Sequence, residues 1–578
     1  MSPIETRAAG LGPAINGLPP PDRKSGQRLS ALAVLLVIAM LSLLPMARLV
    51  MAAIAPGGEA DFASFAARLA RPAALRSMWH TLDTASFGAV FALFLGIPFA
   101  IGVTMTDLPG RRILGFLLLL PLMIAPQVTA LAWLHLFGPS STLLGMLGLA
   151  PPPGTPNPML GRDGIILLYA VQHAPIVFIT MRAGLSRVPR DLVEAARSCG
   201  AGPLGVLRTI VLPVVRPYVV AAAALAFVSG VGNFGIPALL GMPVNYLTLP
   251  TLIYQDLSSF GPGVLPQIAA LSVLVGALAV VGMAFQSMAL RGAGHRVAAG
   301  TPARFELGRY RLPLACACWL VIGLILMLPA CALLATSLVP SFGVPLGWGT
   351  VTASNYTEVL LQQAPTVRAF RNSLLFAGGA ALVLAIGVIP MAARLERFDR
   401  RWRGILNGIV DLPYSIPGVV LAIACILLFL RPLPLIGSLY ATASIILIAY
   451  AMRFLTLAMK PVATAMGQIP RDLEEAAAVS GAGPFRRLWT ITSPLAAPAA
   501  VAGGLLVFMS AFNELTVSAL LWSSGNETLG VVLFSLEEAG LGTQAAAIAV
   551  STIAVVVMLL LALDRLGRRL PTGVLPWR

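Results

Sequence analysis

Twelve apolar stretches follow one another along the chain, separated by short polar or Gly/Pro-rich segments. Each is close to the length of about 20 apolar residues that a helix needs to cross a bilayer. They lie near residues 29–52, 78–106, 113–137, 164–183, 215–241, 265–288, 312–337, 372–394, 405–430, 438–458, 498–522 and 545–563. The pattern predicts an all-α polytopic membrane protein with about twelve transmembrane helices.

The first stretch has a second interpretation, because the basic leader Arg23, Lys24 and Arg28 precedes it. A basic leader before an apolar run is also typical of a cleaved signal peptide. We expect the segment to be retained as a helix, since the equivalent stretch 312–337 opens the second part of the chain.

Composition and charge support a membrane protein. Hydrophobic residues make up 58% and charged residues 11% of the 578 residues, against about 45–50% and about 25% in soluble domains. The net charge of +16 arises from short basic blocks between apolar stretches rather than from one basic face, so nucleic-acid binding is not expected. The five cysteines and four histidines lack metal-ligand spacing, so we expect no resident metal.

The distribution of Lys and Arg predicts the orientation. Basic residues concentrate in alternate connecting segments, whereas the segments 242–264 and 523–544 contain none. Because basic residues accumulate on the cytoplasmic side of membrane proteins, both termini are expected in the cytoplasm.

An internal duplication divides the chain. Residues 188–213 read VPRDLVEAARSCGAGPLGVLRTIVLP and residues 469–494 read IPRDLEEAAAVSGAGPFRRLWTITSP, which match at 15 of 26 positions at a constant offset of 281. We call these the first and second motif loops. The repeat predicts two homologous six-helix halves, with an N-terminal tail 1–28, a first transmembrane domain 29–290, a linker 291–311, a second transmembrane domain 312–565 and a C-terminal tail 566–578.

Each motif loop has the sequence of a helix–turn–helix on the cytoplasmic side, between the fourth and fifth helices of its half. Pro189 and Pro470 can begin a helix at its first turn. Gly200 and Gly481 favour a left-handed cap that ends this helix. A second short helix is then expected to end at Pro213 or Pro494, before the next membrane span.

The spacing within these loops resembles the EAA loop of ABC importer permeases: Glu-Ala-Ala, Gly six residues after the Glu, Ile ten after the Gly and Pro three after the Ile. The residues that carry the resemblance are Glu194, Ala195, Ala196, Gly200, Ile210 and Pro213 in the first loop, and Glu475, Ala476, Ala477, Gly481, Ile491 and Pro494 in the second. The resemblance implies that each loop is a coupling helix seated on one of two separate ATPase subunits, which use the ATP. It also implies a periplasmic substrate-binding protein, a location in the bacterial inner membrane and no cofactor on this chain.

The two loops are not identical. Ser493 stands where the first loop has Leu212, and the second loop carries the additional charges Glu474, Arg486 and Arg487. A hypothesis follows that the two ATPase contacts are unequal.

No phosphate-binding loop is present to supply energy from this chain. Of the two lysines, Lys24 has Leu18 where the first glycine of such a loop should stand, and Lys460 is followed by Pro461. With no catalytic constellation, we expect a permease rather than an enzyme. A secondary transporter is the alternative class, but it should carry its strongest repeat in membrane helices; a docking scaffold without transport is a third.

The substrate is less constrained. A fused chain of this size, with residues 235–241 reading GIPALLG, resembles the ferric-iron permease group most. Thiamine and 2-aminoethylphosphonate permeases share the fused layout, so these substrates stay open.

Polar residues inside apolar stretches are candidates for the translocation pathway, because intramembrane charge is costly. Glu514 should lie within the eleventh span, about 25 Å from its cytoplasmic end at 1.5 Å per residue, and its repeat mate is Asn233. A polar helix–helix contact is the alternative role.

Asp411 is the third candidate, near the cytoplasmic end of the ninth span. It precedes Pro413 and Pro417, and the third span has Pro121 and Pro126 in a similar place. Both spans are therefore expected to be broken, as part of a gate or as kinks for packing.

Overall fold

The computed structural model describes residues 23–152, 154–259, 261, 263–291, 304–432 and 437–567, and these are helical with connecting loops. Within these ranges β-structure is limited to isolated bridges such as that between Thr106 and Phe305. Among the described residues, ten helices are long and apolar enough to cross a membrane, and two further pairs of helices would qualify as bent spans. All twelve apolar stretches thus recur as candidate spans, which confirms the all-α polytopic fold.

The six spans of the first half follow in order. They are α1 (Arg23–Ile38) continued by η1 (Ala39–Leu43) and α2 (Leu44–Ile54), α4 (Pro72–Met105), the pair α5 (Arg111–Met123) and α6 (Pro126–Phe137), α8 (Arg162–Leu185), α11 (Leu212–Val231) and α14 (Val264–Arg291). The first apolar stretch is the helix Leu29–Ile54 in this arrangement.

The second half repeats the series. Its spans are α15 (Arg311–Ile322) continued by η5 (Gly323–Met327) and α16 (Leu328–Ser337), α18 (Ala364–Leu395), the pair α19 (Arg400–Ser415) and α20 (Gly418–Phe429), α21 (Ala443–Met466), α24 (Ser493–Phe512) and α27 (Gly542–Gly567). Most of the linker, residues 292–303, lies outside the described ranges, as do the residues before 23 and after 567.

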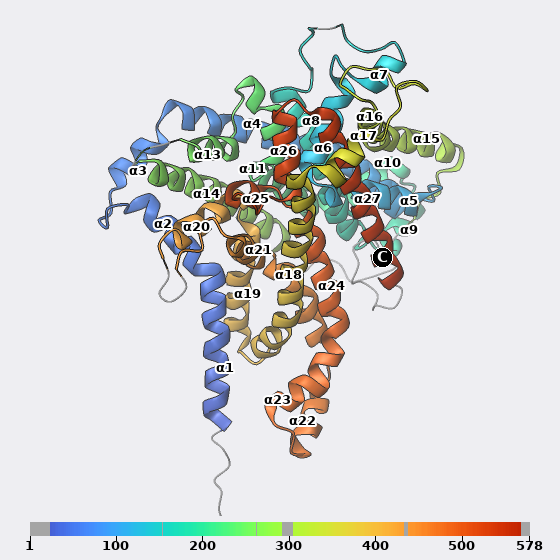
Figure 1. Ribbon diagram of the computed structural model, residues 1–578. Helices are drawn as coiled ribbons and strands as arrows, with labels where there is room; N and C mark the ends of the chain where they lie inside the picture. The colour runs from blue at the N-terminus through green and yellow to red at the C-terminus, as the bar shows by residue number, and fades with distance from the viewer. Residues whose placement is uncertain are drawn as a thin grey trace, which may run out of the picture.

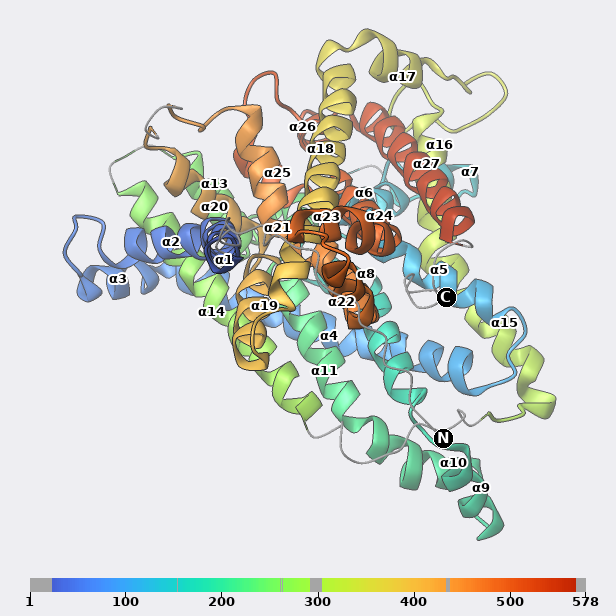
Figure 2. The ribbon, with the colours of Figure 1, turned by 90° about the horizontal axis from the view of Figure 1, so that it is seen from below.

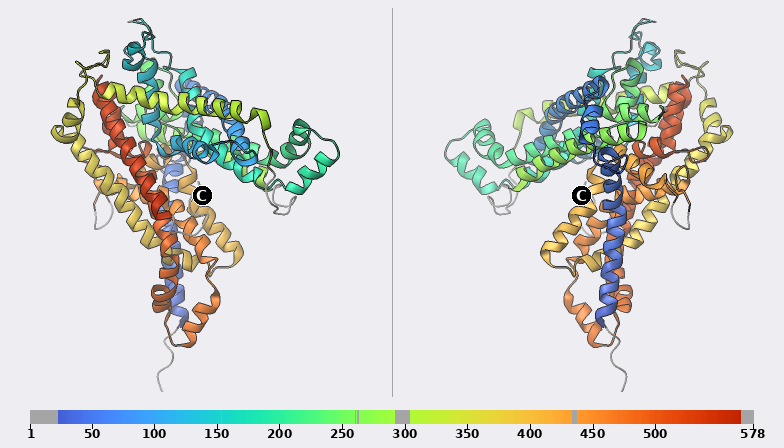
Figure 3. Two further views of the ribbon diagram at one scale, coloured as in Figure 1. Left: turned by 90° about the vertical axis from the view of Figure 1, so that its right-hand side faces the viewer. Right: turned by 90° about the vertical axis from the view of Figure 1, so that its left-hand side faces the viewer.

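The two halves form arms that diverge from a shared region (Figures 1 and 3). Each half sends its first span to the other half, because α2 packs on α20 and α16 packs on α6. Helix α14 adds to the joint by packing on both α2 and α20. The region where the arms meet is therefore built from both halves, whereas the tip of each arm belongs to one half.

The third span of each half is broken, as its prolines predict. The α5 and α6 segments are bent by 102° and the α19 and α20 segments by 99°. A proline cannot donate to the carbonyl four residues earlier, and the residue before a proline avoids the helical conformation. Backbone carbonyls at each break are therefore free to accept other hydrogen bonds.

The fifth span of each half is shorter at its far end than the apolar stretches suggested. It ends at Val231 or Phe512 rather than at 241 or 522, and a separate short helix follows, α12 (Gly235–Leu240) or α25 (Thr516–Leu521). The breaks lie at residues 232–234 and 513–515, where a polar side chain, Asn233 or Glu514, accepts a hydrogen bond from the start of the next helix. Asn233 Oδ1 accepts from the Ile236 amide and Glu514 Oε1 accepts from the Val517 amide, the side-chain-to-backbone bond that favours a new helix start.

At the other end the fifth span is longer than predicted. Pro213 and Pro494 do not end a short helix; the helix continues through them from the motif loop, over Leu204–Val231 and Pro484–Phe512. The π segments η2 (Leu207–Val211) and η7 (Leu488–Thr492) make this possible. In each, the residue before the proline donates its amide to the carbonyl five residues back, Leu212 to Leu207 and Ser493 to Leu488. The wider turn accommodates the proline, which has no amide and would crowd a regular turn.

Candidate coupling loops and central pathway site

The motif loops are helix pairs at the tips of the two arms; the first is seen at the end of its arm in Figure 2 and the second in Figure 1. The first is α9 (Arg190–Ser198) with α10 (Pro203–Val206), and the second is α22 (Arg471–Val479) with α23 (Pro484–Arg487). Gly200 and Gly481 have φ of +83° and +82°, as a left-handed cap requires. A Cβ at either position would meet no atom within 4 Å, so the conformation and not the space demands glycine.

The tips expose side chains that a folded monomer usually buries. Leu204 in the first loop is exposed, and so are Val479, Phe485 and Trp489 in the second. Contiguous exposed apolar side chains mark an interaction surface. Glu194 and Glu475 are exposed beside them, so the motif residues lie where another protein can contact them.

The first motif loop is attached to its arm by apolar packing. Val193 and Val211 are buried in one apolar cluster with Met105 of α4. At the repeat positions of these valines the second loop has Glu474 and Thr492. Glu474 accepts from Thr492 at 3.2 Å and pairs with Arg397, which follows α18, at 3.3 Å. The two loops have the same helix–turn–helix backbone, but the first is attached to its arm by apolar contacts and the second by polar contacts.

A polar cluster at the joint of the arms contains Glu514. It lies just beyond the end of α24 and not inside the span, because the chain turns at residues 513–515. Arg453 of α21 places Nε 3.3 Å from Glu514 Oε2, with side chains only 19% and 11% exposed. Arg453 also donates to the Ile416 carbonyl at the break between α19 and α20. The ion pair thus joins the fourth span, the end of the fifth and the broken third span of the second half.

Arg453 is a member of this cluster that the sequence patterns above did not single out. A signal was present, since it is a charged residue within the tenth apolar stretch, where such residues are rare and paired. Glu514 thus makes a polar contact from the turn after α24 to α21.

The first half has the same arrangement without charge. Gln172 stands at the repeat position of Arg453, and its amide donates to the Pro121 and Ile124 carbonyls at the break of the third span. Asn233 stands at the position of Glu514 and caps α12. An uncharged amide pair in one half therefore corresponds to an ion pair in the other.

The two halves touch at these breaks. Asn513 donates to the Met123 carbonyl of the first half at 3.0 Å. At the repeat position of Asn513 stands Gly232, where a Cβ would lie 2.9 Å from Pro417 of the second half. The end of each fifth span therefore contacts the broken third span of the other half, and glycine is needed for the closer approach.

Asp411 is not part of this cluster. It lies within α19, where its carboxylate pairs with Lys460 Nζ of α21 at 3.4 Å. Both side chains are substantially exposed, so this pair is a weaker contact than the buried one.

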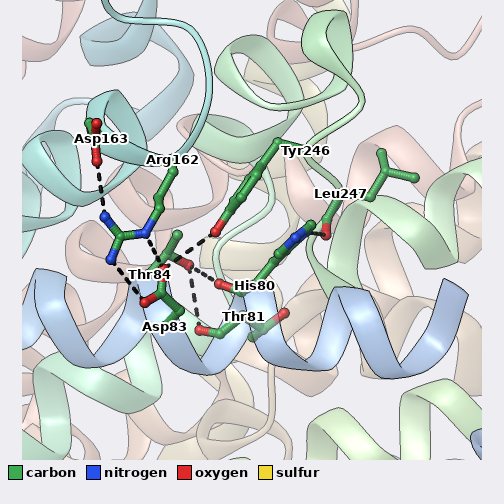
Figure 4. Close-up of polar contacts among 8 residues, drawn as sticks. All are labelled: His80, Thr81, Asp83, Thr84, Arg162, Asp163, Tyr246 and Leu247. Carbon is green, nitrogen blue, oxygen red and sulfur yellow. Dashed lines mark hydrogen bonds and ion pairs between the residues drawn. The ribbon is translucent and has the colours of Figure 1, made fainter. Parts of the chain in front are cut away.

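A second polar cluster, also missed from the sequence, lies in the first half (Figure 4). Arg162 at the start of α8 makes two hydrogen bonds to Asp83 of α4, and the Tyr246 hydroxyl donates to the same carboxylate. His80 stacks on Tyr246 and contacts the Leu247 carbonyl. The cluster ties the segment after α12 to the second span.

The second half ties its corresponding segment to α18 with different residues. Asn372 donates to the Glu527 carbonyl, and Ser373 accepts from the Leu529 amide. In the first half Thr81 accepts from Leu249 in the same way. The main-chain contacts are preserved while the charged residues differ.

Comparison with known proteins matches both halves. The family described as "Binding-protein-dependent transport system inner membrane component" matches residues 32–293 and 384–574. The probable ABC transporter permease protein y4fN of Sinorhizobium fredii is 27% identical over 503 residues, covering 85% of this chain and 87% of that protein. The ferric transport system permease protein FbpB of Actinobacillus pleuropneumoniae is 23% identical over 502 residues, covering 85% of this chain and 70% of that protein.

Among solved structures, a chain of a bacterial ABC transporter involved in alginate import is similar with a TM-score of 0.36. The sequences are 19% identical, and the similarity covers 46% of this chain and 97% of that chain.

Proposed function

The chain belongs to the family of binding-protein-dependent transport system inner membrane components, as an ABC importer permease with two fused halves, and from this premise we propose that its two motif loops each dock on one ATPase subunit. The observation that supports this role is the pair of exposed helix–turn–helix tips at the ends of two diverging arms (Figure 3). ATP is used by those partner subunits, and this chain binds no cofactor.

The continuity of each motif loop with the fifth span gives a route for coupling. Because the helix runs without interruption from the tip through the π segment to Val231 or Phe512, movement of a tip carries the far end of the span with it. Closure of the ATPase subunits would bring the tips together. The ends of the fifth spans at the joint would then be displaced.

The joint of the arms is the proposed gate of the translocation pathway. The Arg453–Glu514 pair and the Asn513–Met123 contact hold the broken third spans against the ends of the fifth spans. When the arms close at their tips, these contacts separate and the opposite face opens. Asn233 and Glu514 then border the pathway at the gate, and Asp411 borders it on the side of the motif loops.

The positive-inside bias supports an orientation with the motif loops and both termini in the cytoplasm of a bacterium. The joint then faces the outer side of the inner membrane, where a separate periplasmic binding protein delivers substrate. The transmembrane domains are residues 29–290 and 312–565, embedded in lipid.

Ferric iron is the proposed substrate. Its support is the fused layout and the similarity to a ferric transport system permease over 85% of this chain. 2-Aminoethylphosphonate is an alternative, because a putative permease for it is 28% identical over 192 residues, 33% of this chain, and thiamine is the other alternative.

Purification from native membranes in mild detergent tests the coupling role. We expect two ATPase subunits per chain, lost when Gly200 and Gly481 are both replaced by valine, because φ near +80° excludes a β-branched residue. Gly349→Val, at an exposed glycine outside the motif loops, is the matched control and should retain both subunits. Uptake driven by a proton or sodium gradient with no ATPase attached would establish the secondary-transporter alternative instead.

A further inference from the structure

A cavity of about 690 Å³ lies between the two halves, at the joint and away from the motif loops. The first half contributes the end of α6, the loop that follows it and α12. The second half contributes Phe342 and the end of α26 (Leu529–Glu538). This volume is in the range of small-molecule sites and far exceeds the roughly 30 Å³ that one water occupies.

The charged groups of the cavity are all acidic or imidazole. Glu537 and Glu538 line it together with His135, and no Lys or Arg is among its described lining residues. The His135 side chain is 1% exposed, with Nε2 3.4 Å from Glu537 Oε2. Its Nδ1 has no hydrogen-bond partner within the described part of the chain. A carboxylate thus meets a buried imidazole at the cavity wall, and the second ring nitrogen of that imidazole has no partner among the described residues.

Glu538 adds a second carboxylate to the cavity lining and is exposed. No hydrogen bond or ion pair to its side chain occurs within the described ranges. Neighbouring protein atoms partly desolvate it and raise the pKa of its carboxyl above the usual range. An unpaired carboxylate in such surroundings gains free energy when a cation approaches.

The internal repeat shows that the elements of the cavity recur without its charged groups. The hydrogen bonds of Leu249 and Leu529 align α13 (Leu249–Leu257) with α26 at an offset of 280, so Leu257 and Ser258 are the counterparts of Glu537 and Glu538. Counted from the breaks of the third spans, Leu427 of α20 is the counterpart of His135. The fold itself does not require the charged groups, since the repeat-related helices α13 and α20 form without them.

We propose that this cavity accepts a positively charged cargo, with Glu537, Glu538 and His135 as the groups that hold it before it crosses the joint. The inference rests on the proposed function and narrows its substrate class to cations. A hydrated or chelated metal ion and an organic cation share the required chemistry, and the remaining walls are largely apolar. An oxyanion would meet two carboxylates and, among the described lining residues, no Lys or Arg, so it would be repelled.

Direct binding tests the cavity. The full chain with its ATPase subunits, in nanodiscs of phosphatidylcholine, is titrated separately with Tb³⁺, thiamine and molybdate near pH 6.5. Tb³⁺ is a hard trivalent cation whose emission Trp133, two residues before His135, can sensitise. We expect one bound cation per chain, no molybdate, and a weakening of about tenfold or more in Glu537→Gln/Glu538→Gln, equivalent to about 1.4 kcal/mol or more.

Two controls separate a site from a general charge effect or misfolding. Glu59→Gln removes an exposed carboxylate away from the cavity and should leave binding unchanged. His135→Gln should weaken binding by several-fold while the thermal unfolding temperature and the bound ATPase subunits are retained. If the glutamate variants lose thermal stability and the ATPase subunits, Glu537→Asp serves in their place, because it keeps the charge and should keep cation binding.

Each outcome decides between the two proposals. Cation binding that is insensitive to Glu537 and Glu538, or binding of molybdate in the cavity, overturns the inference and leaves His135–Glu537 as a contact between the halves. Thiamine binding without Tb³⁺ binding supports the cavity and replaces ferric iron as substrate. A chain that binds the cation and carries no ATPase subunits overturns the proposed coupling role while the site stands.

Discussion

The two motif loops have the same backbone and are held to their arms by different forces. In the first, Val193, Val211 and Met105 share an apolar cluster. In the second, Glu474, Thr492 and Arg397 form a polar network at corresponding positions. Counted from Pro98 and Pro390, Met105 and Arg397 are also counterparts. All three positions have changed together, because a carboxylate placed alone among apolar side chains is strongly destabilising.

The linker strengthens the first loop further. The Phe305 amide donates to the Met105 carbonyl, and the guanidinium of Arg197 in α9 lies 5.3 Å from the centre of the Phe305 ring. The Arg197–Phe305 distance is suitable for a cation–π contact. The first loop is therefore supported by its own half and by the linker that follows that half.

The joint repeats the same contrast. Gln172 and Asn233 make neutral hydrogen bonds at the positions where Arg453 and Glu514 form an ion pair. In both regions the duplicated chain kept main-chain geometry and exchanged side-chain chemistry. The difference shows that the backbone defines the transporter architecture, whereas the side chains make its two halves unequal.

The largest effect is expected at the ion pair of the joint. Arg453→Gln copies the first half but leaves Glu514 buried without its partner, and should cost about 3 kcal/mol or more of unfolding free energy. Adding Glu514→Asn completes the neutral pair and should recover most of the loss. Denaturant unfolding of the two single variants and the double variant measures the coupling. Additive effects would show that the pair is not an energetic unit.

A smaller loss is expected in the first motif loop. Val193→Ala removes about two buried methyl groups and should destabilise the attachment of α9 by about 2 kcal/mol. Hydrogen exchange should accelerate in α9 and remain unchanged in α22. The matched control Leu192→Ala alters an exposed neighbour and should leave exchange nearly unchanged. Equal acceleration in both variants would argue against apolar packing as the attachment.

The cap glycines should behave alike in the two loops, which sharpens the comparison. Gly200→Ala and Gly481→Ala each impose a left-handed conformation on a residue with a Cβ, at a cost of about 1 kcal/mol. The cost is measured as the loss of ATPase-subunit binding in each single variant. Gly202→Ala, in the turn of the first loop, is the control. A large difference between the two variants would show that the loops already differ at the backbone.

The smallest effect is expected in the second loop. Glu474→Gln weakens a partly exposed ion pair and should cost less than about 1 kcal/mol. High salt should accelerate exchange in the wild-type α22 toward that of the variant and affect α9 less, because salt screens charges and not the apolar contacts that hold α9. An equal or larger acceleration in α9 would contradict the contrast between the loops.

The local features were predictable from sequence because each depends on neighbours in the chain. Pro126 and Pro417 stand at the breaks of their spans, and Gly200 and Gly481 have the left-handed conformation. The prediction that Pro213 and Pro494 end a short helix was wrong, because a continuous helix runs through both prolines. The π turn that carries the helix through each proline depends on one widened hydrogen bond, which the proline alone does not specify.

The sequence by itself determined that this protein is a duplicated membrane permease with two motif loops, since apolar length, repeat spacing and charge bias are properties of a linear chain. Only the tertiary structure joined Arg453 to Glu514, Asn513 to Met123 and His135 to Glu537. The last two contacts link residues about 400 positions apart, across the two halves. No local pattern specifies them, because they form only after each half has exchanged its first span with the other and both broken helices have come together at the joint.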